Sequence, residues 1–238
     1  MKLFFLFDRT FGVGVRWIQT SMIRRSPYKG VHYLVNQRAI QDSAEYVLAN
    51  ISEFLLFSSR EDLWTYCLSK TSSVQCDGGL IVEFGVWKGE STNFFAKKCK
   101  NAAVHGFDSF KGLEEDWLGT GASKGTFDTG GNLPKCQKNV VLHVGWFEET
   151  LPSFISQIGD SQIHFLHMDA DTYKPTAYVL DSLTKNLKSG TIVVFDEYFG
   201  YSGWEMHEFK AFQEWVGTQS IKYKYLGCTE MAVGIEIL

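Results

Sequence analysis

Several carboxylates directly follow apolar runs that read as buried strands. Asp108 ends one run, Asp169 and Asp171 follow another, and Asp196 and Glu197 follow a third. Adjacent parallel strands lie about 5 Å apart, so we expect the last four acids to meet in one cleft. Their mutual repulsion there favours a bound cation or raised pKa values. Oxygen ligands suit Mg²⁺, Mn²⁺ or Ca²⁺ better than zinc, and the alternative is helix capping and solvated loop acids.

A second chemical feature is the turn after the apolar run 80–84, where Glu83 is followed by Gly85 and Gly89. The glycines permit a tight turn and close approach to a ligand, and a helix from about Ser91 presents free N–H groups. The dinucleotide fingerprint GxGxxG is absent. An acid in this turn repels phosphate and suits an amino-bearing ligand, such as the methionine end of S-adenosylmethionine. An ordinary strand–turn–helix corner is the alternative.

Two further positions complete a nucleoside site, and a histidine adds a proton acceptor. Asp108 lies where a carboxylate can accept hydrogen bonds from a ribose diol, a feature shared by NAD enzymes and methyltransferases. Trp146 or Phe147, after Gly145, could flank an adenine, although core packing explains either ring equally well. His207, near the start of a later helix, is a reserve proton acceptor whose alternative is a structural role.

The elements that position these residues alternate between strand and helix patterns from residue 79 onward. Apolar runs joined by helices predict a parallel sheet covered on both faces. The last two strands are joined by a link too short for a helical crossover, so they should pair antiparallel. The fold class is therefore α/β, doubly wound, with a mostly parallel seven-stranded sheet ending in an antiparallel hairpin. Predicted strands span 80–84, 104–107, 140–144, 163–168, 191–195, 223–226 and 232–237, and predicted helices span 91–99, 148–157, 174–187 and 205–216.

Two other segments frame this core. Residues 1–75 carry helical patterns at 38–56 and 61–68, and we expect a helical segment packed on a domain that covers 76–238. Residues 110–138 contain six glycines and little periodicity. A long loop after the second strand lies over the expected crevice, which favours a lid.

Composition limits the partners and the compartment. The 238-residue chain has a formal net charge of −4, which argues against nucleic acid as a partner. Its five scattered cysteines lack zinc spacing and predict reduced thiols in a cytoplasmic protein. Asp8 and Arg9 interrupt the N-terminal apolar run, and no stretch reaches the length of a membrane span. The sequence leaves two possibilities undecided: attachment of the N-terminus to a membrane surface, and formation of a homo-oligomer.

From about residue 61 to its end the chain resembles class I S-adenosylmethionine-dependent methyltransferases, whose sheet ends in such a hairpin. Within them it is most similar to the macrocin O-methyltransferase family, which methylates sugar hydroxyls. Five blocks in the same order carry the resemblance, at 83–89, 107–113, 145–152, 169–173 and 195–198.

The resemblance implies roles for individual residues. Glu83, Gly85 and Gly89 would hold the methionine portion of the cofactor, Asp108 the ribose, and residues 145–147 the adenine. Ser91, Ser109 and Asp169 join the expected cofactor-binding set. A magnesium ion would bind Asp169, Asp196 and Glu197, with Asp171 as the base. His207 stays the reserve base that the residues alone suggest. The family commonly has a second aspartate where this chain has Glu197.

These observations lead to the expectation of a metal-dependent O-methyltransferase that acts on a hydroxyl of a glycan or small-molecule acceptor. One alternative is a nucleotide-sugar glycosyltransferase, because Asp169-Ala170-Asp171 is also a DxD motif, although Lys174 is the one basic residue close to it. A second is a non-catalytic S-adenosylmethionine-binding module. A dehydrogenase is a distant third.

Overall fold

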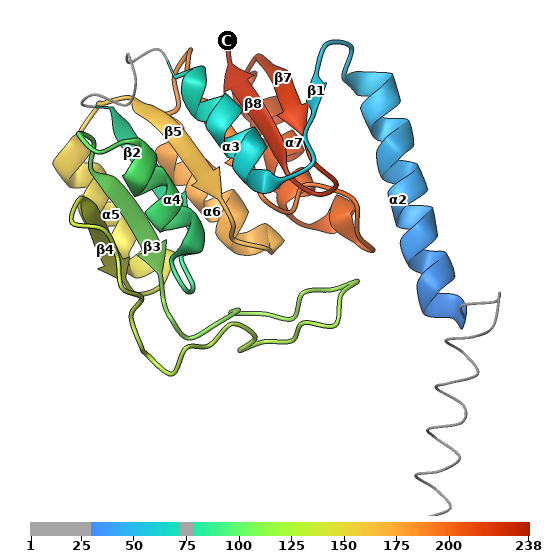
Figure 1. The fold of residues 1–238 in the computed structure, drawn as a ribbon, viewed down its shortest axis with the longest axis horizontal. Coiled ribbons are helices and arrows are strands. Elements are labelled where there is room, and N and C mark those ends of the chain that lie inside the picture. Colours follow the sequence, from blue (N-terminus) through green and yellow to red (C-terminus); the bar gives the residue numbers. More distant parts are fainter. Residues whose placement is uncertain (1–29, 72–78) are drawn as a thin grey trace, which may run out of the picture.

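A computed structural model describes residues 30–71 and 79–238, and the remaining residues lie outside this account. The described chain forms three layers, with one mixed sheet between two layers of helices (Figure 1). The sheet has eight strands in the order β1-β7-β8-β6-β5-β2-β3-β4. The predicted α/β class with a mostly parallel sheet is confirmed.

The strands pair as their connections require. Neighbours joined through helices are parallel, and β8 is antiparallel to both β6 and β7, which confirms the predicted hairpin. All seven predicted strands are present. The eighth, β1, is a two-residue strand parallel to β7, in a segment where we expected a helix to continue. The strands are β1 (Leu55–Leu56), β2 (Leu80–Phe84), β3 (Val104–Asp108), β4 (Val140–Val144), β5 (Ile163–Met168), β6 (Ile192–Phe195), β7 (Tyr223–Cys228) and β8 (Val233–Ile237).

Helices cover both faces of the sheet because its central strands are apolar on both sides. One buried cluster joins α3 and α4 to residues such as Ile81 and Phe165, and a second joins α5, α6 and α7 to residues such as Val82 and Leu166. The side chains of successive residues along a strand therefore pack into the buried clusters on opposite faces of the sheet. The helices are α2 (Gly30–Asn50), α3 (Arg60–Ser69), α4 (Glu90–Lys98), α5 (Phe147–Ile158), α6 (Tyr173–Leu183) and α7 (Glu208–Gln219), with a 3₁₀ turn, η2 (Trp204–Met206), before α7.

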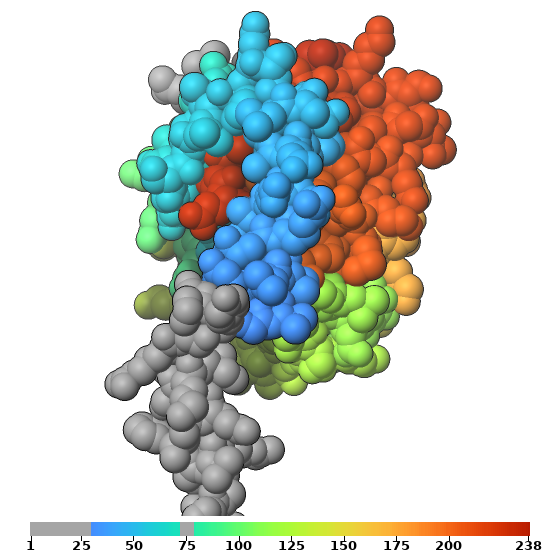
Figure 2. Space-filling view, turned by 90° about the vertical axis from the view of Figure 1, so that its right-hand side faces the viewer, coloured from blue at the N-terminus to red at the C-terminus, as the bar shows by residue number. Residues whose placement is uncertain are grey.

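Helix α2 lies along one side of the molecule beside the C-terminal elements (Figure 2). Two polar contacts tie it there: Gly200 N donates to Ser43 Oγ (2.9 Å), and the Tyr46 and Tyr225 hydroxyls are 2.5 Å apart. Helix α3, by contrast, packs within the same layer as α4. The core therefore runs across the predicted boundary between 1–75 and 76–238, and that division stays a prediction.

Cysteine chemistry differs from the expectation at one position. Cys67, Cys136 and Cys228 are free, but Cys99 is disulfide-bonded, so the prediction of reduced thiols throughout is wrong for Cys99. Within residues 30–71 and 79–238, no helix has the length and apolarity that crossing a membrane requires. A cytoplasmic location stays a prediction.

Candidate functional site

A cavity lies at the carboxyl ends of the parallel strands, between the turn after β2, the 110–138 loop and the starts of α5 and α6. This is where open α/β sheets bind ligands. Most of the residues expected to bind the cofactor line it. Glu83, in strand β2, and Gly89 and Gly145, in the turns, do not. The expected residues in the lining are Gly85, Ser91, Asp108, Ser109, Trp146, Phe147 and Asp169.

Gly85 makes the close approach between β2 and β5 that shapes the cavity floor. Its φ is +95°, and a Cβ added there would stand 1.8 Å from the carbonyl oxygen of Asp169. Backbone bonds fix the two strand ends together, since Asp169 N donates to Phe84 O (2.8 Å). A side chain at position 85 would therefore displace Asp169, so glycine is required for both conformation and space.

Asp108, at the end of β3, organises the turn after β2. Its Oδ2 accepts hydrogen bonds from the backbone N–H groups of Val86 (2.9 Å) and Trp87 (2.7 Å), and its Oδ1 accepts from Phe110 N (2.7 Å). A carboxylate has about four lone-pair sites, so acceptor capacity is left on the cavity side. Asp108 lines the cavity, and its predicted contact with a ribose stays a prediction.

Three acids meet on the cavity wall, and we call Asp169, Asp171 and Glu197 the acidic group. One carboxylate oxygen from each lies within 4.8 Å of the others. Asp171 holds a left-handed backbone conformation (φ +62°), and Glu197 Oε2 is buried without a hydrogen-bond partner among the described residues. The strand ends bring these carboxylates together without neutralising them.

Burial of the acidic group disfavours its charged form. Burial raises the pKa of each member well above the ordinary carboxylate value, and neighbouring carboxylates raise it further. For Asp171 the strongest of these neighbours is Glu208, and for Glu197 it is Asp169. A cation placed among the three would relieve this repulsion.

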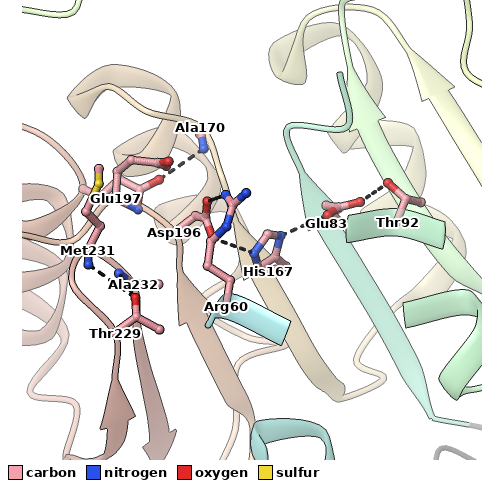
Figure 3. A network of polar contacts seen from close by, with 11 residues as sticks. Arg60, Glu83, Thr92, His167, Ala170, Asp196, Glu197, Thr229, Met231 and Ala232 are labelled. Atoms are coloured by element: carbon pink, nitrogen blue, oxygen red, sulfur yellow. Dashed lines mark hydrogen bonds and ion pairs between the residues drawn. The ribbon is translucent and has the colours of Figure 1, made fainter. Parts of the chain in front are cut away.

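A second set of charges lies beside the first and is balanced. We call Arg60, Asp196, His167, Glu83 and Thr92 the ion-pair chain (Figure 3). Arg60 pairs with Asp196 Oδ2, whose other oxygen is 3.6 Å from His167 Nε2. On the far side of the imidazole ring, His167 Nδ1 lies 3.0 Å from Glu83 Oε1, and the hydroxyl of Thr92 donates to Glu83 Oε2.

The ion-pair chain fixes the protonation state of His167. Burial acts to lower the pKa of His167, but the carboxylates of Asp196 and Glu83 outweigh burial and raise the pKa to about 10. Burial likewise acts to raise the pKa of Asp196, and His167 and Arg60 outweigh it and lower the pKa. Two cations therefore alternate with two anions along the chain.

Asp196 and Glu197 are consecutive residues with different surroundings. Asp196 joins the ion-pair chain, on the side of the sheet covered by α3, whereas Glu197 belongs to the acidic group. The structure thus brings together Asp169 and Glu197 from the predicted metal set, adds the predicted base Asp171, and pairs Asp196 with Arg60 and His167 instead.

Glu208, at the start of α7, is a residue that sequence reasoning missed. Its side chain is fully buried, Oε1 accepts from Ala170 N (3.1 Å), and Oε2 accepts from Glu197 N (3.2 Å). One carboxylate thereby fixes both loops that carry the acidic group. No local pattern marks it, because the two loops become neighbours only once β5 and β6 pair.

His207 lies next to Glu208 but is not among the residues that line the cavity. Its Nε2 is 2.8 Å from the carbonyl oxygen of Leu118, so this nitrogen carries a proton and donates it. The ring also packs against Trp117 and Tyr201. His207 therefore anchors the 110–138 loop, and Leu113 and Trp117 of that loop line the cavity, as a lid would.

Comparisons with known proteins agree with this geometry. Residues 82–198 match a family model described as a methyltransferase domain, while no curated protein matches the sequence. The fold is similar to that of CalS11, a calicheamicin methyltransferase (TM-score 0.60, 23% identity, covering 89% of this chain and 93% of that one). A second structure of CalS11, in its apo form, is described as a TDP-rhamnose 3′-O-methyltransferase (TM-score 0.53, 22% identity, covering 90% and 98%). The O-methyltransferase NovP is also similar (TM-score 0.53, 20% identity, covering 74% and 79%).

Proposed function

We propose, from the premise that this chain is a class I S-adenosylmethionine-dependent methyltransferase, that it methylates a hydroxyl oxygen of a sugar in a glycan or natural product. CalS11 supports the acceptor class, because it has the same fold and is described as a methyltransferase of a TDP-linked sugar. The observation that carries the proposal is the acidic group beside the glycine turn, within one cavity.

The acidic group fits a divalent metal ion. Its donors are all carboxylate oxygens, which suit magnesium, and Glu197 Oε2 has no other partner among the described residues. Asp169 and Glu197 would hold the ion. Such an ion would lower the pKa of the sugar hydroxyl.

The chain's own residues supply the remaining steps. The turn at Gly85 and the N–H groups near Ser91 hold the methionine end of the donor, and Asp108 accepts from the ribose. The carboxylate of Asp171 takes the hydroxyl proton while that oxygen attacks the methyl carbon in line and the thioether leaves. Leu113 and Trp117 exclude water, so most of the rate gain comes from alignment in a dry site.

Label transfer tests the proposal. Purified protein with methyl-labelled S-adenosylmethionine, Mg²⁺ and a panel of glycosides should label an acceptor, and chelation by EDTA should abolish the transfer. Asp171→Asn should also abolish transfer while Mg²⁺ affinity is kept, whereas loss of Mg²⁺ affinity would make Asp171 a ligand instead of the base. Binding of S-adenosylmethionine without turnover on any hydroxyl acceptor would favour a non-catalytic binding module.

A further inference from the structure

Helix α3 contributes two residues to the cavity from outside the matched methyltransferase segment. Arg60 and Trp64, one helical turn apart, both line the cavity, and the family match begins at residue 82. The guanidinium carbon of Arg60 lies 5.6 Å from the centre of the Trp64 ring. The sequence predicts a helix at 61–68 that includes Trp64, but it gives neither residue a role in ligand binding.

The two side chains offer hydrogen-bond donors that the protein does not use up. The Arg60 side chain is 50% exposed, and its ion pair with Asp196 involves one terminal nitrogen, Nη1. The indole Nε1 of Trp64 is buried and has no hydrogen-bond partner among the described residues. An unpaired buried donor is costly unless a ligand satisfies it.

Few other basic side chains line the cavity and could bind an anion in place of Arg60. The lining of the cavity includes seven acids but two basic residues, Arg60 and Lys88. The ammonium group of Lys88 lies 4.1 Å from the centre of the Trp87 ring, on the turn after β2. Arg60 is instead held by buried Asp196, which orients its guanidinium before any ligand arrives.

We propose that Arg60 and Trp64 form an anion subsite that binds the carboxylate of the cofactor's amino-acid end. This proposal rests on the proposed function. The Trp64 ring contacts Phe94 and Phe95 of α4, so the subsite lies beside the helix whose start faces the methionine portion. Trp146 and Phe147, expected at the adenine, begin α5 after β4, on the other side of the cavity. The cofactor's carboxylate is thus the anion nearest to Arg60.

Ligand truncation tests this assignment. Calorimetry would compare S-adenosylhomocysteine with 5′-methylthioadenosine, which keeps the adenosine thioether and lacks the amino-acid end. Arg60→Gln should weaken S-adenosylhomocysteine binding roughly 10- to 100-fold, as expected for a charged hydrogen bond, and change 5′-methylthioadenosine binding by less than about twofold. Arg60→Lys should lose less, because it keeps the charge but not the planar fork.

The matched control is Arg38→Gln, since Arg38 is also ion-paired to an aspartate but lies on α2, away from the cavity. It should leave both affinities unchanged. Equal weakening of both ligands by Arg60→Gln, or no weakening of either, would overturn the subsite. Pyrophosphate binding that Arg60→Gln removes, with S-adenosylhomocysteine unaffected, would assign the anion to a phosphorylated acceptor and also overturn it. Failure of the wild-type protein to bind S-adenosylhomocysteine would end the proposed function as well.

Discussion

The ion-pair chain and the acidic group lie at the ends of the same strands, β5 and β6, and differ in charge balance. In the ion-pair chain each carboxylate has a cation beside it, and the pKa of Asp196 is lowered despite its burial. In the acidic group the pKa of all three members is raised by burial and by neighbouring carboxylates. Similar side chains thus occupy two different electrostatic states a few residues apart.

The difference in charge balance indicates that the ion-pair chain stabilises the fold and that the acidic group serves activity. The ion-pair chain has its charges balanced by the protein itself, although His167 Nε2 and Asp196 Oδ1, 3.6 Å apart, lack a hydrogen-bond partner among the described residues. Breaking the chain leaves an unpaired buried charge. An unbalanced group is destabilising as it stands and gains from a ligand that the protein does not contain. Substitutions in the first should therefore cost stability, and substitutions in the second should cost activity.

The largest effect is expected at the acidic group. Asp171→Asn should lower methyl transfer by about 10²- to 10⁴-fold, the usual contribution of a general base. The free energy of unfolding should not fall, because the change removes a repelled charge and Asn tolerates the left-handed backbone. Steady-state kinetics and urea denaturation measure the two quantities. Asp181→Asn, an exposed change on α6, is the control, and a marked loss of stability in Asp171→Asn would contradict the comparison.

The ion-pair chain should respond in the opposite way. His167→Gln removes the cation between Asp196 and Glu83, and we expect it to lower the free energy of unfolding by about 3–5 kcal/mol. His164→Gln, on the same strand but half-buried and bonded to one backbone N–H, should cost about 1 kcal/mol. Urea denaturation compares them, and equal costs would show that the chain is not a balanced unit.

Glu208 fixes the positions of the two loops that carry the acidic group. Glu208→Gln leaves one acceptor oxygen for two backbone donors, so one of the loops carrying the acidic group loses its anchor. Mg²⁺ affinity should fall about tenfold, measured by calorimetry. Glu214→Gln, an exposed change on the same helix, should leave it unaltered. Unchanged affinity in Glu208→Gln would mean that the loops hold their positions without this carboxylate.

The smallest effect concerns a half-buried pair of histidines on β3 and β4. His105 Nδ1 lies 3.1 Å from His143 Nε2, and burial, with a contribution from His143, lowers the pKa of His105 to about 4. The unfolded chain takes up this proton near pH 6.5, before the native state does, so stability should fall as the pH drops from 6.5 toward 4. Thermal unfolding of His105→Gln should show a weaker acid dependence, and an identical dependence would assign it to other groups.

The fold was largely predictable because strand and helix periods differ and the order of elements restricts the sheet. β1 was missed because two residues carry no period, and its hydrogen bonds come from β7. The predicted helix at 205–216 begins later, at Glu208, because residues 204–206 form a 3₁₀ turn first. Tertiary contacts decide such boundaries.

The sequence predicted which strand ends meet at the site, but not the direction of each side chain there. Asp169, Asp171 and Glu197 do meet, but the sequence could not tell that Asp196 faces Arg60 while Glu197 faces the cavity. Consecutive side chains after a strand point to opposite sides, and the choice depends on the partners on each side. Arg60 and Glu208 escaped notice for the same reason, since each acts across a large sequence separation.

We propose that the acidic group is unbalanced because it holds a cation next to the methyl donor. Calorimetric titration of Mg²⁺ into the protein with S-adenosylhomocysteine bound tests this directly. We predict one ion per chain in the wild-type protein and at least a tenfold weaker affinity in Glu197→Gln, which removes one carboxylate. Wild-type protein without saturable Mg²⁺ binding, or Glu197→Gln with unchanged affinity, would contradict the account.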